Sequence, residues 1–176
     1  ALLLGLGGVL FLSVAFPNRQ NWWALIPGTT LLSIALLIFL EETAPRLADR
    51  FGGSIVLGGI GLSFLLIYLF DARQWWAIIP FGVLGSLAAM IGLENVFPGL
   101  QTPGLFFMGL GLTFALVAAQ SSADREMRWA WIPAGILLLM GVIFMAAGGD
   151  MLGVLWPLAL ILAGVFLVAR SLLGRR

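Results

Sequence analysis

Few side chains in this sequence could perform acid–base, nucleophilic or metal chemistry. Histidine and cysteine are absent, and charged residues make up only 10% of the 176 residues. Their absence removes most metal, haem and thiol chemistry, because such sites use imidazole or thiolate ligands. No acid–base pair and no serine with a histidine base can be assembled. We therefore expect a protein that is not an enzyme, with no catalytic residue, no metal site and no cofactor.

The few ionisable residues avoid the long apolar runs. None lies in the middle of such a run, and Glu94, beside Asn95 at the end of one, comes closest. Ionisable groups inside a membrane mark proton relays, ion pathways and voltage sensors. This pattern argues against a pump, a proton-coupled carrier or a charge-selective pore. The remaining polar groups are mostly hydroxyls, which we expect to bond back to their own helix.

A tryptophan–proline motif occurs three times. RQNWWALIP returns as RQWWAIIP and, more loosely, as REMRWAWIP, with successive prolines 53 residues apart. Tryptophan rings favour the lipid headgroup region, and a proline inside a helix kinks it. We interpret the motif as interfacial anchoring and helix shaping; an aromatic site for a lipid, quinone or pigment ring is the alternative. The residues concerned are Trp22, Trp23, Pro27, Trp75, Trp76, Pro80, Trp129, Trp131 and Pro133.

A glycine motif precedes each tryptophan–proline motif, and many small residues are spaced four apart. This spacing places small residues on one helix face, where backbones can approach closely in lipid. Phosphate-binding glycine loops need a preceding strand, which the sequence does not show. We expect helix packing at the pairs Gly59/Ser63, Gly82/Ser86 and Gly109/Thr113.

The elements that carry these motifs are long apolar helices. Hydrophobic residues make up 61% of the chain and the mean hydropathy is +1.10, well above a soluble domain. A bilayer core of ~30 Å needs roughly 20 apolar residues per helix. The predicted spans are 1–16, 22–40, 51–70, 75–94, 104–120, 129–147 and 151–169.

Short polar links between these spans predict antiparallel hairpins. The expected fold is an all-α polytopic membrane bundle of about seven transmembrane helices, forming one domain over residues 1–176. It contains three tandem hairpin repeats, at about 1–42, 51–94 and 104–147, and a closing helix at 151–170. Alignment of the repeats predicts that the first helix begins a few residues before Ala1.

Arginines are sorted to one side of this arrangement. The loops 17–21, 71–74 and 121–128 and the C-terminus carry seven arginines, against two, Arg46 and Arg50, on the other side. Positive residues favour the cytoplasmic side. We therefore predict an external N-terminus and a cytoplasmic C-terminus, in a bacterial inner membrane.

The last span carries Trp156, Pro157, Gly164 and Arg170. This layout, a tryptophan–proline start, a glycine and a terminal arginine cluster, resembles the LiaI/LiaF-like transmembrane region of bacterial envelope-stress proteins. The hairpin over 59–92 has a similar layout. The resemblance implies a role in regulating the envelope-stress response.

The small-residue faces and the lack of buried charge favour a non-catalytic structural or accessory subunit. Its expected partners are the lipid bilayer and other membrane protein subunits, or further copies of itself. No basic run points to nucleic acid. The alternatives are an envelope-stress regulator of the LiaF-like type and a small-molecule or lipid transporter.

Overall fold

A computed structural model describes residues 1–100, 102–120 and 128–146. These residues form α-helices joined by turns and short 3-10 helices, so the all-helical prediction is confirmed. The α-helices are α1 (Leu2–Ala15), α2 (Leu25–Thr43), α3 (Pro45–Phe70), α4 (Ile78–Val96), α5 (Thr102–Ala119) and α6 (Trp131–Ala146). The 3-10 helices are η1 (Arg19–Ala24), η2 (Trp75–Ala77) and η3 (Arg128–Ala130).

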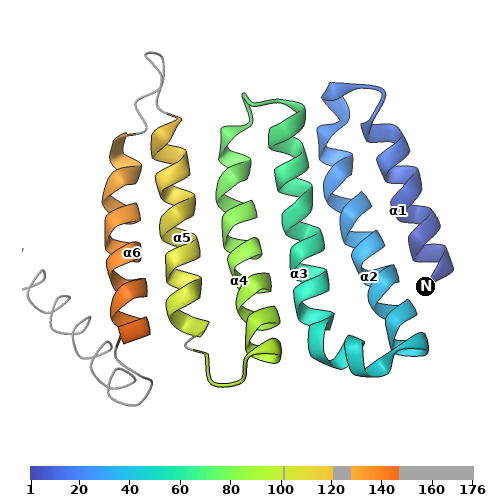
Figure 1. The fold of residues 1–176 in the computed structure, drawn as a ribbon. Coiled ribbons are helices and arrows are strands. Elements are labelled where there is room, and N and C mark those ends of the chain that lie inside the picture. The colour runs from blue at the N-terminus through green and yellow to red at the C-terminus, as the bar shows by residue number, and fades with distance from the viewer. Residues whose placement is uncertain (101, 121–127, 147–176) are drawn as a thin grey trace, which may run out of the picture.

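The six α-helices stand side by side in one row, each antiparallel to the next (Figure 1). All the substantial contacts between described α-helices join neighbours along the chain, from α1 with α2 to α5 with α6. The described part of the chain is therefore a layer one helix thick. Each helix buries a narrow strip against its neighbours and leaves two broad faces uncovered within this layer.

Five helical segments are long and apolar enough to cross a membrane. They are Gln20–Thr43, Pro45–Phe70, Trp75–Val96, Thr102–Ala119 and Arg128–Ala146. They match five of the predicted spans, whereas the helix in the predicted span 1–16 has only 14 residues. The predicted span 151–169 and closing helix 151–170 lie outside the described residues.

The predicted spans 22–40 and 51–70 leave residues 41–50 as a polar link, and a loop there is wrong because nearly all of these residues are helical. α2 continues to Thr43, α3 begins at Pro45, and only Ala44 between them has a non-helical backbone. Proline suits the first position of a helix, since its fixed φ is helical and its missing N–H would have no partner there. The 26 residues of α3 give a length of about 39 Å. This exceeds an apolar core of ~30 Å, so the charged first turns reach beyond it.

A reciprocal hydrogen-bonded contact joins the start of α3 to the end of α4. Arg50 Nη2 donates to the backbone carbonyl of Asn95 (2.6 Å), and Asn95 Nδ2 donates to the carbonyls of Arg50 (2.5 Å) and Ile91 (2.8 Å). A cation at a helix C-terminus also interacts favourably with the helix dipole. The side chain of Arg50 therefore caps α4 and fixes the neighbouring helix ends.

We expect Arg50→Ala to destabilise the protein by about 0.5–1.5 kcal/mol, the usual net contribution of one hydrogen bond. Arg46→Ala is the matched control, because Arg46 is also an exposed arginine and lies about one turn earlier in α3. Thermal unfolding in a mild detergent measures both. Equal effects of the two variants would contradict a specific role for Arg50.

Candidate functional site

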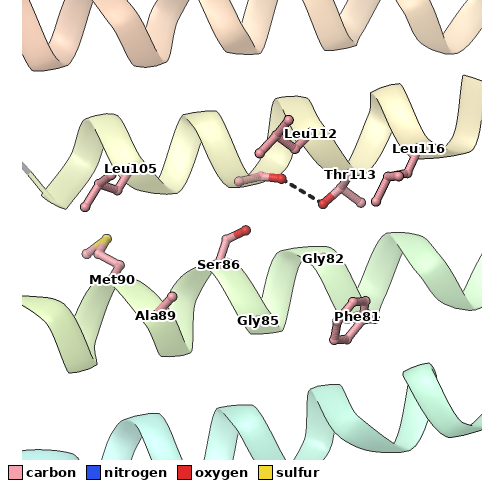
Figure 2. A pocket seen from close by; sticks show the side chains of 11 residues that line it. Phe81, Gly82, Gly85, Ser86, Ala89, Met90, Leu105, Leu112, Thr113 and Leu116 are labelled. Atoms are coloured by element: carbon pink, nitrogen blue, oxygen red, sulfur yellow. Dashed lines mark hydrogen bonds between the residues drawn. The ribbon is translucent and has the colours of Figure 1, made fainter.

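Glycines let neighbouring helices of the described layer approach closely, and the contact between α4 and α5 is a clear example. A Cβ atom added at Gly82 would overlap the side chain of Thr113, and one added at Gly109 would overlap that of Ser86. Ser86 follows Gly82 by four residues, and Thr113 follows Gly109 by four. Each glycine thus makes room for the residue four positions after the other glycine. Figure 2 shows Ser86 and Thr113 between the two helices.

The same reciprocal arrangement joins two other helix pairs. In α1 and α2, Gly8 and Gly28 accommodate Leu32 and Leu12; in α5 and α6, Gly104 and Gly141 accommodate Met145 and Met108. At the latter pair even the backbones are close. A Cβ added at Gly141 would lie 3.0 Å from the carbonyl oxygen of Gly104.

The contact between α2 and α3 contains half of this arrangement. Gly59 accommodates Ser33, but Thr29 stands where the reciprocal glycine would be. Ser63, which follows Gly59 by four residues, is fully buried. The structure therefore brings the predicted residue Gly59 against a serine, Ser33, that was not among the predicted packing residues.

Four of the hydroxyl groups at these contacts bond within their own helices, as predicted. The acceptors are the carbonyls of Leu25 for Thr29, Thr30 for Ser33, Ile60 for Ser63 and Gly109 for Thr113. The last of these bonds is dashed in Figure 2. These four hydroxyls are thus satisfied locally, and they act between helices as small packing groups. Close van der Waals contact between small groups is a principal force between helices in lipid.

Two grooves open on the layer where α2 meets α3 and where α4 meets α5. Their volumes are about 310 and 290 Å³. In the second, Leu112 and Leu116 are more than half exposed, whereas Thr113 is 5% exposed. The grooves therefore have leucine rims and floors of small residues.

The six tryptophans of the described residues lie at one end of the layer, in or next to the 3-10 helices. Trp22 and Trp76 pack edge to face with ring centroids 5.8 Å apart, and Trp76 Nε1 donates to Gln74 Oε1 (2.7 Å). By contrast Trp23, Trp129 and Trp131 are about half exposed. The rings therefore have two environments: Trp23, Trp129 and Trp131 stay exposed, whereas Trp22 and Trp76 contribute to packing between helices.

The prolines do not interrupt continuous α-helices. Pro27, Pro80 and Pro133 are each the third residue of their α-helix, directly after a 3-10 turn that contains tryptophan. In the first turn of a helix the backbone N–H has no partner within the helix, so its loss costs little. Each proline therefore lies just after a junction between a 3-10 helix and an α-helix.

We expect Pro80→Ala to change the free energy of unfolding by less than about 1 kcal/mol. Leu87→Pro, in the middle of the same helix, should cost about 3 kcal/mol or more, because it removes a helical hydrogen bond and introduces a clash. Thermal unfolding of both variants in detergent distinguishes the two positions. A large loss of stability with Pro80→Ala would show that the proline stabilises contacts beyond its own helical turn.

Charged residues of the described segments lie toward helix ends. Glu41 and Glu42 are at the end of α2, and Glu94 is near the end of α4. Within residues 1–100, 102–120 and 128–146, no three histidine, cysteine, aspartate or glutamate side chains are grouped to hold a metal ion. The best-defined geometry in the described part is therefore that of the contacts between helices.

Comparison of the chain with family models, curated proteins and solved structures gives no match.

Proposed function

We propose that this chain is a non-catalytic membrane subunit that packs against other membrane proteins or further copies of itself. The observation that carries the proposal is the layer one helix thick. Its helices use their glycines to contact their neighbours, yet leave large apolar side chains uncovered in the described layer. Leu6, Leu69 and Ile136 are 63%, 67% and 55% exposed. Lipid covers part of such a surface, and partner helices cover the rest.

We further propose seven spans built from three tandem hairpins and a closing helix. Support comes from positions that recur in the layer. Ser33 and Ser86 lie 53 residues apart and meet Gly59 and Gly109, which have equivalent places in the glycine motif. The turns around 17–18 and 71–74 lie at one end of the row (Figure 1). Together with the arginine bias, this favours a cytoplasmic face at that end and a bacterial inner membrane.

Photo-crosslinking in native membranes tests the proposed subunit role. A photoreactive residue is introduced at Leu6, Leu69 or Ile136, and at Ile67, which is 0% exposed, as the interior control. We expect discrete protein adducts from at least one exposed position and only intrachain products from Ile67. Lipid adducts alone at every exposed position, with a monomer on purification in mild detergent, would contradict the proposal.

A further inference from the structure

The two grooves occupy equivalent places in the chain. Ser33, Gly59 and Leu62 line the groove between α2 and α3, while Ser86, Gly109 and Leu112 line the one between α4 and α5. The residues of α4 follow those of α2 by 53 positions, and those of α5 follow those of α3 by 50. Matching positions of the chain form the same hollow twice. The hollow is therefore a feature of the repeated helix packing and not a local packing defect.

The lining of each groove favours an apolar occupant. Ser33 is 6% exposed on the floor of the first groove, whereas Leu62 on its rim is 47% exposed. The hydroxyls of Ser33 and Thr113 already donate to backbone carbonyls of their own helices. An occupant therefore needs no hydrogen-bonding group at Ser33 or Thr113, and it gains contact with the leucine walls.

The dimensions favour a chain rather than a helix. Along α4 the second groove runs from Phe81 to Met90, a length of about 14 Å. This is about half of an apolar core of ~30 Å, the share of one leaflet. A helix with its side chains is about 10–12 Å wide, too wide for a hollow of about 290 Å³.

Charge near the groove supplies a headgroup preference. Phe81 lies in the first turn of α4, so the groove begins near the end of the layer that carries Arg73 and Arg128. Both arginines are exposed. Asp71, at the same end, accepts a hydrogen bond from the backbone N–H of Arg73. Exposed basic residues at the edge of a membrane attract anionic lipid headgroups.

We propose that each groove binds one acyl chain of an anionic phospholipid, with its headgroup at the arginine end of the layer. The bound chain fills the space that the small floor residues leave between neighbouring helices. This inference goes beyond the proposed subunit function, because it requires no protein partner.

Photoreactive lipids test the site on the purified chain in vesicles. Phosphatidylglycerol and phosphatidylcholine with the same diazirine-bearing acyl chain are compared, and adducts are located by mass spectrometry. We expect groove residues to be labelled more than Ile136 and Leu139, which are similarly exposed on α6. Unlabelled phosphatidylglycerol should compete better than phosphatidylcholine. Labelling that follows exposure alone, or equal competition by the two lipids, would overturn the proposal.

Gly85→Phe provides a groove-blocking variant. A Cβ at Gly85 has room, with the ring of Phe81 as its nearest neighbour at 3.8 Å. The larger side chain should reduce labelling between α4 and α5 by most of its value and leave the groove between α2 and α3 labelled as an internal control. Unchanged labelling of the blocked groove contradicts the site. If both grooves lose label because the variant misfolds, the lipid competition on the unmodified chain decides.

A matched pair of arginine substitutions tests the headgroup preference. Arg73→Gln should reduce the preference for phosphatidylglycerol by about fivefold, the effect of one basic residue near an anionic surface. Arg46→Gln, in the first turn of α3 at the opposite end, should leave it unchanged. Equal effects of the two substitutions would overturn the headgroup assignment. In native membranes, a protein adduct in place of the lipid adduct would show that a partner side chain occupies the groove.

Discussion

Gly141→Ala should destabilise the protein by about 1–3 kcal/mol, the usual cost of an extra group in a well-packed interior. The added Cβ would lie 2.9 Å from the backbone nitrogen of Met108 and 3.0 Å from the carbonyl oxygen of Gly104. Backbone atoms held within a helix cannot turn aside as a side chain can. α5 and α6 would therefore have to separate, and contacts along both helices would weaken.

Gly135→Ala, in the same helix, is the matched control. Among the described residues, no atom outside its chain neighbours and the nearby backbone of its own helix lies within 4 Å of a Cβ added at Gly135. Alanine favours a helix over glycine by roughly 0.5–1 kcal/mol, so this variant should be neutral or slightly more stable. Thermal unfolding of both variants in one detergent gives the comparison. Similar effects at Gly135 and Gly141 would show that the close backbone approach does not control stability.

The sequence predicts most of the described helices because apolar runs of membrane length are a strong signal. It fails at 41–50, where charged residues were interpreted as a loop. Charged residues mark where the apolar part of a helix ends. The helix itself continues beyond that point as long as its backbone hydrogen bonds remain favourable. Pro45 starts α3 there, and Arg50 bonds to the end of α4. Asn95, the partner of Arg50, lies 45 residues away along the chain, so no local sequence pattern reveals this contact.

The sequence likewise predicts some of the packing residues and misses others. A spacing of four between small residues predicts Gly82/Ser86 and Gly109/Thr113, and these two pairs meet each other. It does not predict Gly104 or Gly141, because each is followed four residues later by a methionine. A glycine's importance depends on the size of the side chain that the neighbouring helix presents to it. That information belongs to the pairing of two helices and is absent from either one alone.

Exchanging the side chains of Ser86 and Gly109 should test this pairing directly. Gly109→Ser alone places two side chains where the structure holds one, because a Cβ at Gly109 would overlap Ser86. We expect a loss of about 1–3 kcal/mol from such overpacking. Ser86→Gly alone leaves a small gap and should cost less. The double variant again has one serine and one glycine facing each other, so it should recover most of the loss.

A second double variant, Gly109→Ser with Ser33→Gly, is the control for this exchange. Ser33 faces Gly59 between α2 and α3, a different helix contact. Substitutions at separate contacts add independently, whereas touching residues show coupling of about 0.5–3 kcal/mol. Rescue should therefore occur with Ser86→Gly and not with Ser33→Gly, measured by unfolding of all variants in the same detergent. Additive losses in both double variants would mean that α4 and α5 are held together elsewhere. Selective rescue would establish that a serine on one helix and a glycine on the next specify this contact as a pair.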